Sequence, residues 1–140
     1  MFDRILIPTD GSDEAEAAVE YALELAQLTG AEVHALYVIE TRASYIITLD
    51  VKGEEMAEYE EYGRRVVEDV VRRADEVDLE AVGSIKKGKV ASQIVEYAND
   101  NRVDQIVVGG RGQGAVGRYL GSTAQKVANI SDIPVTIVEA

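Results

Sequence analysis

A stretch rich in glycine near the C-terminus carries the residues best suited to chemistry in this sequence. It reads Gly109-Gly110-Arg111-Gly112-Gln113-Gly114-Ala115-Val116-Gly117, and Gly121-Ser122-Thr123 follows shortly after. Glycines let the backbone approach an anion closely, and amide N–H groups in such a loop can donate to phosphate oxygens. The Arg111 guanidinium and the hydroxyls of Ser122 and Thr123 would add hydrogen bonds. The pattern predicts a phosphate-binding loop, and the alternative is a surface turn.

A second candidate group is a carboxylate near the N-terminus. The segment Pro8-Thr9-Asp10-Gly11-Ser12 closes a short apolar run over 4–8, which is typical of a buried strand. Asp10 could accept a hydrogen bond from a ribose hydroxyl or help to hold a magnesium ion. An Asx turn leading into the next helix accounts for the same residues equally well. Both interpretations stay open at this point.

Two motif matches point to other nucleotide sites, and both are weak. Gly112-x-Gly114-x-x-Gly117 has the dinucleotide spacing, but three residues separate it from the preceding strand and only one strand follows, which disfavours an NAD-dependent enzyme. Gly83 to Lys89 matches the Walker spacing, yet Val90 stands where that motif needs a hydroxyl for magnesium. We therefore interpret 86–89 as a solvated basic turn, and the alternative is that Lys86, Lys87 and Lys89 attract a ligand phosphate.

Dedicated covalent catalysis has no support in the residue types. The sequence has no cysteine, and His34 is its one histidine. His34 falls near the start of a predicted strand, away from the expected ligand edge, so we expect no catalytic or metal role for it. Neither a Ser-His-Asp arrangement nor an activated thiol can be assembled, and we predict no catalytic residue.

The composition is that of a single folded domain over residues 1–140. Apolar residues make up 46% of the chain, and no run reaches the roughly 18 apolar residues of a membrane span. The start of the chain lacks the features of a signal peptide, so we expect a cytoplasmic protein. The formal net charge of -12 would repel nucleic-acid phosphates. An acidic, lysine-poor surface could also reflect a halophilic, high-salt cytoplasm.

The elements that must position these residues alternate between strand and helix. The periodicities predict five strands over 4–8, 33–39, 79–85, 105–108 and 134–138. They predict four helices, from an N-cap at Ser12 to a stop at Gly30, over 53–75, around 91–98 and around 119–127. Strict alternation requires parallel strands joined by right-handed crossovers, which gives a three-layer α/β sheet with helices on both faces. Ligands of such sheets bind outside the carboxyl ends of the strands, after the first and fourth strands here.

The sequence resembles the universal stress proteins over essentially the whole chain. Besides the order of elements, two segments carry the resemblance: Pro8-Thr9-Asp10-Gly11-Ser12 and Gly109-x2-Gly112-x8-Gly121-Ser122. The resemblance implies an open sheet of five parallel strands in the order 3-2-1-4-5, the adenine nucleotide alpha hydrolase-like fold. It also implies a stress-response or signalling module that binds ATP and has at most weak ATPase activity. The family loop is Gly-x2-Gly-x9-Gly-Ser/Thr, whereas the spacer 113–120 has eight residues in this sequence.

Carried over by position, the resemblance assigns roles to individual residues. Asp10 would lie near the ribose and the magnesium ion, and the backbone of Val38 would pair with the adenine. The implied binding residues for ATP, or for ADP or AMP, are Pro8, Thr9, Asp10, Val38, Val108, Gly109, Arg111, Gly112, Gly121, Ser122 and Thr123.

The last predicted strand is a candidate dimer contact. Val135-Thr136-Ile137-Val138 would form an apolar sheet edge, and the resemblance implies homodimers paired through this strand. The rival function is a dimeric stress-response adaptor that binds no nucleotide and acts through protein partners. The shortened glycine spacer is the feature in favour of that rival.

Overall fold

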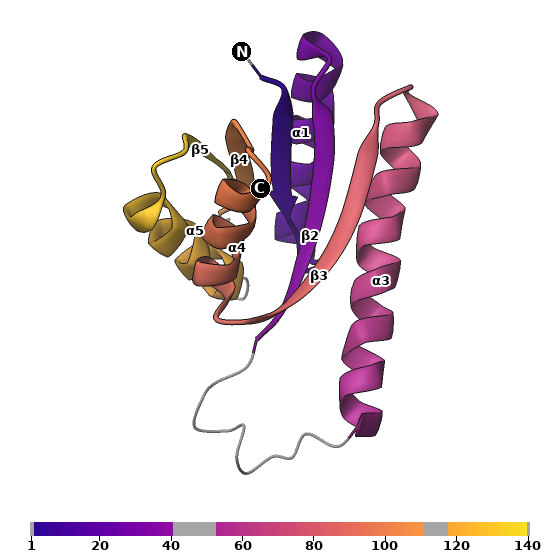
Figure 1. Cartoon of the computed structure of the whole chain (residues 1–140), viewed down its shortest axis with the longest axis vertical. Coiled ribbons are helices and arrows are strands. Elements are labelled where there is room, and N and C mark those ends of the chain that lie inside the picture. The colour runs from indigo at the N-terminus through magenta and orange to yellow at the C-terminus, as the bar shows by residue number, and fades with distance from the viewer. Residues whose placement is uncertain (1, 41–52, 111–117, 140) are drawn as a thin grey trace.

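The computed structural model describes residues 2–40, 53–110 and 118–139, and its elements alternate along the chain as expected (Figure 1). In chain order they are β1 (Arg4–Pro8), α1 (Asp13–Thr29), β2 (Glu32–Glu40), α3 (Gly53–Glu76), β3 (Ala81–Gly88), α4 (Val90–Asp100), β4 (Gln105–Gly109), α5 (Arg118–Ile130) and β5 (Val135–Val138). In these described ranges no helix is both long and apolar enough to span a bilayer.

The sheet has the predicted order, β3-β2-β1-β4-β5, with every neighbouring pair parallel. Helices α1 and α3 cover one face, and α4 and α5 cover the other (Figure 1). The three-layer α/β fold is therefore confirmed. In this order the chain reverses its direction of winding between β1 and β4, so a crevice is expected at the carboxyl ends of these strands.

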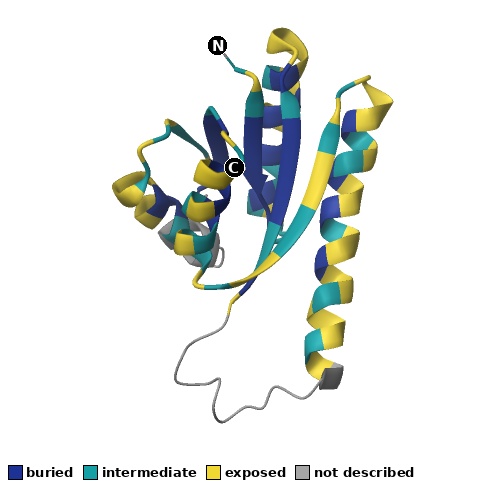
Figure 2. Cartoon of the chain, viewed as in Figure 1, coloured by how far each residue is buried: buried dark blue, intermediate teal, exposed yellow. Residues whose placement is uncertain are grey.

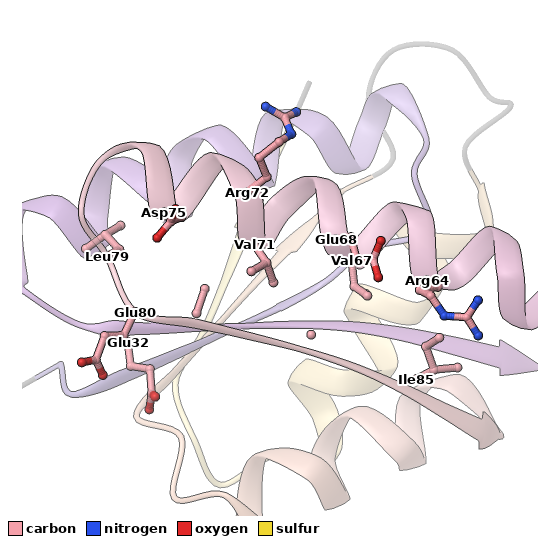
Figure 3. Close-up of a pocket in the computed structure, with 12 residues that line it drawn as sticks. Glu32, Arg64, Val67, Glu68, Val71, Arg72, Asp75, Leu79, Glu80 and Ile85 are labelled. Atoms are coloured by element: carbon pink, nitrogen blue, oxygen red, sulfur yellow. The ribbon is translucent and has the colours of Figure 1, made fainter.

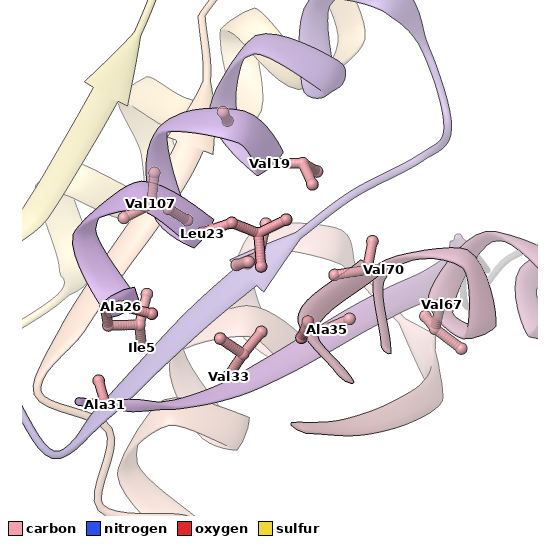
Figure 4. Close-up of a cluster of buried hydrophobic side chains, with 14 residues drawn as sticks. Ile5, Val19, Leu23, Ala26, Ala31, Val33, Ala35, Val67, Val70 and Val107 are labelled. Atoms are coloured by element: carbon pink, nitrogen blue, oxygen red, sulfur yellow. The ribbon is translucent and has the colours of Figure 1, made fainter. Parts of the chain in front are cut away.

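The central strand β1 is buried on both of its faces (Figure 2). Ile5 and Ile7 pack with residues of α1 and α3, whereas Leu6 packs with residues of α4 and α5, as alternation along a strand requires. Figure 4 shows the first of these clusters, in which Val19 and Leu23 of α1 and Val67 and Val70 of α3 lie against the strands. The continuous apolar run seen in the sequence reflects burial on two sides.

Helix α1 begins and ends where its sequence predicts. The Ser12 side chain accepts a hydrogen bond of 3.2 Å from the Ala15 amide, and acidic residues occupy the first turn. Gly30 closes the helix with φ +77°, a left-handed conformation that favours glycine, and its amide donates to the carbonyl of Ala26. These caps fix the position at which the chain leaves the β1 loop and enters α1.

The interpretation of 86–89 as a solvated turn is wrong for its first three residues. Strand β3 continues through Lys86 and Lys87 to Gly88, and these residues pair with Val38, Ile39 and Glu40 of β2. The extended β2 supplies backbone partners whatever the side chains are, and an edge strand tolerates exposed lysines. Lys87 also forms an ion pair of 2.8 Å with Glu60 of α3.

His34 is a packing residue with satisfied ring nitrogens. It is buried, its Nδ1 lies 2.6 Å from the Tyr97 hydroxyl, and its Nε2 lies 3.2 Å from a carboxylate oxygen of Glu32. Tyr97 belongs to α4, so the contact fastens that helix to β2. No cluster of three or more potential metal ligands occurs in the part of the chain that the structure describes.

Candidate functional site

A cavity of about 850 Å³ lies at the carboxyl ends of β1 and β2, beside the start of α4 and one face of α5. Its polar and charged side chains come from strand ends and helices alike, and its apolar wall comes mainly from β2 and α4. The lining residues are Pro8, Thr9, Asp10, Leu36, Tyr37, Val38, Glu40, Lys89, Val90, Ala91, Ser92, Ile94, Thr123, Lys126 and Ile130. We call this cavity the strand-end pocket.

Several predicted site residues meet in the strand-end pocket although they are far apart in the sequence. These are Pro8, Thr9, Asp10, Val38 and Thr123. Val108 and Gly109 are buried at the end of β4 and do not line the pocket. Gly121 and Ser122 lie on α5, while Arg111 and Gly112 lie outside the described residues, as does the start of the 113–120 spacer.

The pocket also contains residues that the sequence analysis missed. Lys126 and Ile130 are not among the predicted site residues, and Lys89 is expected at a ligand only as the alternative to a solvated turn. Thr123, Lys126 and Ile130 follow one another at spacings of three and four residues, which places them on one face of α5. That helical spacing, counted from the predicted Thr123, is the signal that could have found them.

The loop after β1 holds Asp10 by a network of local hydrogen bonds. One carboxylate oxygen of Asp10, Oδ1, accepts from the Ser12 amide at 2.9 Å, and the Thr9 hydroxyl accepts from the Gly11 amide at 3.1 Å. The Thr9 amide donates to the carbonyl of Leu36 in β2. The Asx turn is therefore present, and among the described residues it uses only Oδ1 of the carboxylate.

Helix α3 reaches this loop through Tyr62. Its hydroxyl donates a hydrogen bond of 3.0 Å to the backbone carbonyl of Asp10, and its ring packs edge-to-face on Tyr37 with centroids 5.6 Å apart. Gly11 has φ +81°, and a Cβ at this position would lie 2.5 Å from the Tyr62 hydroxyl. The close approach of tyrosine and glycine ties α3 to the loop that carries Asp10.

We expect Tyr62→Phe to lower the free energy of unfolding by about 1 kcal/mol, because the ring packing stays and one hydrogen bond to the Asp10 carbonyl is lost. Urea denaturation measures the change. Tyr59→Phe, which alters another exposed tyrosine of α3, is the matched control. Equal losses in the two variants would contradict a specific role for the Tyr62 hydroxyl.

Tyr37 provides a pH-dependent test of the same cluster. Burial raises the pKa of its hydroxyl, and Tyr62, Asp10 and Tyr59 raise that pKa further. The unfolded chain then releases this proton first, near pH 10, so stability falls as the pH rises from there through the folded-state pKa. We expect the stability of Tyr37→Phe to fall less steeply between pH 9 and 11 than that of the unmodified protein. Parallel denaturation profiles would contradict the raised pKa.

The strand-end pocket combines an apolar wall with polar groups at its edge. Val38, Val90 and Ala91 are partly buried and offer apolar surface that a planar ring can contact, while Thr9, Asp10 and Thr123 can form hydrogen bonds. This combination is typical of sites for small amphipathic ligands. The arrangement can bind such a ligand.

A larger groove of about 1010 Å³ runs between α3 and the outer strand β3 (Figure 3). It extends toward the amino ends of the strands, where Leu79 and Glu80 precede β3. Its arginines are already engaged along α3, Arg64 with Glu61 and Arg72 with Asp69 and Glu76. The ligand edge of a parallel sheet lies at the opposite end, so we assign the candidate site to the strand-end pocket.

Comparison with known proteins places the chain in a family. The model of the universal stress protein family matches residues 1–139. Universal stress protein MJ0531 of Methanocaldococcus jannaschii is 31% identical over 141 aligned positions, covering 99% of this chain and 83% of that protein. The solved structure of MJ0577 from the same organism has a TM-score of 0.83 at 27% identity, covering 100% of this chain and 97% of that one. A universal stress protein in complex with cAMP has a TM-score of 0.73 at 23% identity, covering 98% and 97%. The chain belongs to the universal stress protein family.

Proposed function

We propose that this protein binds an adenine nucleotide, ATP or its products ADP and AMP, in the strand-end pocket. The observation that carries the proposal is the convergence of Asp10, Val38 and Thr123 on one cavity at the carboxyl ends of β1 and β2. The loop after β1 supplies Asp10, β2 supplies Val38 and α5 supplies Thr123, so only a folded chain forms this site. The size of the pocket, about 850 Å³, is sufficient for a nucleotide.

Each part of the nucleotide has a proposed partner. The adenine would contact the apolar wall and pair with the backbone of Val38, and the ribose would hydrogen-bond to Asp10. Pro8 and Thr9 shape the floor beneath the ribose. The phosphates would be held by the segment that begins at Val108 and Gly109 and continues through Arg111, Gly112, Gly121, Ser122 and Thr123. Backbone amides and the start of α5 would supply the donors.

Magnesium has one candidate ligand in the pocket. Asp10 retains a carboxylate oxygen that its Asx turn does not use, and magnesium bound with a nucleotide commonly takes one or two carboxylates and the phosphates. The ion would neutralise phosphate charge when bound. We propose that the protein hydrolyses ATP slowly at most.

The fold supports nucleotide binding in a general way. A universal stress protein that shares this fold was solved with cAMP, an adenine nucleotide, and at 23% identity the likeness concerns the fold alone. Contacts in this chain's own pocket therefore carry the specific proposal.

We propose that residues 1–140 form one universal stress protein domain. We further propose that the protein acts in the cytoplasm, in stress response or signalling. Homodimers would form through β5, because Val135–Val138 pairs with β4 on one side and leaves the other side of the strand as the sheet edge. Light scattering at micromolar concentration should give twice the monomer mass, and a monomer mass would contradict this contact.

The second candidate function is the dimeric adaptor that binds no nucleotide. The eight-residue spacer over 113–120 favours it, because a loop one residue short would hold Gly121 and Ser122 at a different distance from the phosphates.

Calorimetric titration of ATP with magnesium into nucleotide-free protein separates the two functions. We expect saturable binding of ATP, with AMP as a second ligand and NADH as a control that does not bind. The titration is run at moderate and at high salt, because the net charge of -12 is also expected of a protein from a high-salt cytoplasm. Absence of binding at both salt concentrations would contradict the nucleotide proposal and favour the adaptor.

A further inference from the structure

Lysine is scarce in this chain, and the lysines that the structure describes lie near the ligand edge of the sheet. The sequence has 26 acidic and 14 basic residues, of which only five are lysine. Of these, Lys86, Lys87, Lys89 and Lys126 are in the described part of the chain, and Lys89 and Lys126 line the strand-end pocket. Lys86 and Lys87 end the neighbouring strand β3. The positive charge of lysine is thus concentrated at the ligand edge.

Most arginines of the described ranges are neutralised elsewhere. Arg4 pairs with Glu32 at the amino end of the sheet, and Arg73 forms a two-pronged pair with Glu16 of α1. Arg64, Arg65 and Arg72 pair with carboxylates of their own helix α3. Among the described residues that line the strand-end pocket, Lys89 and Lys126 are the cationic side chains.

Lys89 and Lys126 enter the strand-end pocket from two different helices. Lys126 lies three residues after Thr123 on the same face of α5, whereas Lys89 directly precedes α4. Among the described residues neither lysine has a carboxylate within ion-pair distance, although Asp10 and Glu40 line the strand side of the same pocket. Both ammonium groups are therefore available to a bound anion.

Lysine is an unfavourable residue at the position that Lys89 occupies at the start of α4. It is the N-cap of α4, where Ser, Thr, Asp or Asn would satisfy an amide, and its side chain makes no capping hydrogen bond. The first turn of α4 also lacks an acidic residue, so a cation adds to the positive end of the helix dipole. Local stability does not account for lysine at this position, whereas positive potential in the pocket does.

We propose that Lys89 and Lys126 determine the charge specificity of the strand-end pocket, so that it favours nucleotides over uncharged nucleosides and favours more phosphates over fewer. This inference rests on the proposed function. A protein with net charge -12 repels a polyphosphate, and two ammonium groups at short range offset the Asp10 and Glu40 carboxylates that line the same pocket. Charge-assisted hydrogen bonds to phosphate oxygens then increase the affinity with each added phosphate.

The test compares two double variants that carry the same net charge. One is Lys89→Gln with Lys126→Gln. The control is Lys86→Gln with Arg102→Gln, which removes one cation from β3 and one from beyond the far end of α4, neither lining the pocket. Calorimetry gives the dissociation constants of ATP, AMP and adenosine for both variants and for the unmodified protein, each at two salt concentrations.

We expect each pocket lysine to contribute about tenfold to ATP affinity at low salt, so that the pocket variant binds ATP roughly a hundredfold more weakly. Its adenosine affinity should stay within about twofold, and the preference for ATP over AMP should shrink. In the control variant, ATP affinity should change by less than about threefold. The slope of ATP affinity against salt should flatten in the pocket variant only.

Three results would overturn the proposal, and they are distinguishable from one another. Unchanged ATP affinity in the pocket variant would show that the lysines do not contact the ligand. Equal losses in both double variants would show an effect of overall charge. If the unmodified protein binds neither ATP nor adenosine, the proposed function itself is wrong, and the charge specificity falls with it.

Discussion

Replacing Ala91 with tryptophan is expected to abolish ATP binding, raising the dissociation constant by about a hundredfold or more. Ala91 lies in the first turn of α4 and lines the strand-end pocket beside Val90 and Ile94. An indole at this position would occupy the space in which the adenine is proposed to sit. Because Ala91 is only partly buried, the added ring can project into the pocket without overpacking the core. Calorimetric titration measures the loss.

The control for this variant is Asn99→Trp, which places the same ring on an exposed position in the last turn of α4, outside the pocket. We expect Asn99→Trp to bind ATP with unchanged affinity. Both variants should keep a cooperative thermal transition, and ATP should raise the melting temperature of the control alone. If Ala91→Trp still binds ATP with normal affinity, the nucleotide lies elsewhere, and the glycine-rich segment would have to be considered without this pocket.

Gly109→Ala is expected to give the largest loss of stability among these substitutions, about 3 kcal/mol in the free energy of unfolding. Gly109 is buried at the end of β4, and a Cβ there would lie 2.6 Å from the carbonyl oxygen of Glu14 and 3.2 Å from the Cα of Ala15. Both atoms belong to the backbone of α1, so relief requires moving the helix away from the strand. That movement would also displace the start of the glycine-rich segment. Urea denaturation measures the loss.

Gly30→Ala separates this steric effect from backbone strain. A Cβ at Gly30 meets nothing within 4 Å, but the residue has φ +77°, a conformation that costs a non-glycine residue about 1 kcal/mol. We therefore expect Gly30→Ala to lose about a third as much stability as Gly109→Ala. Equal losses would indicate that α1 moves easily and that the contact between helix and strand is loose.

Local patterns in the sequence predicted the elements of the fold well. The apolar run 4–8, the N-cap at Ser12 and the stop at Gly30 each depend on neighbouring residues, and the structure confirms them. Alternation of strand and helix was sufficient for a parallel three-layer sheet. The strand order came from the family resemblance, because alternation by itself permits more than one order of parallel strands.

Local patterns were misleading where a neighbouring strand decides the structure. Lys86 and Lys87 carry charges and precede a glycine, which indicates a turn, yet β2 extends beside them and pairs with their backbone. The sheet register therefore overrides local preference. The error hid the approach of Lys89 to the pocket, since the length of β3 determines where α4 begins.

The sequence by itself determined the order of elements, the caps of α1, the two segments suited to phosphate and ribose, and a composition that disfavours nucleic acid and membrane. These properties depend on residue type and on spacing within about one turn or strand. Only the tertiary structure decided that Tyr62 of α3 holds the Asp10 carbonyl, and that Lys89 and Lys126 share a pocket with Asp10. These residues lie 37 to 116 positions apart, so their placement depends on register and helix packing, which nearby residues do not encode.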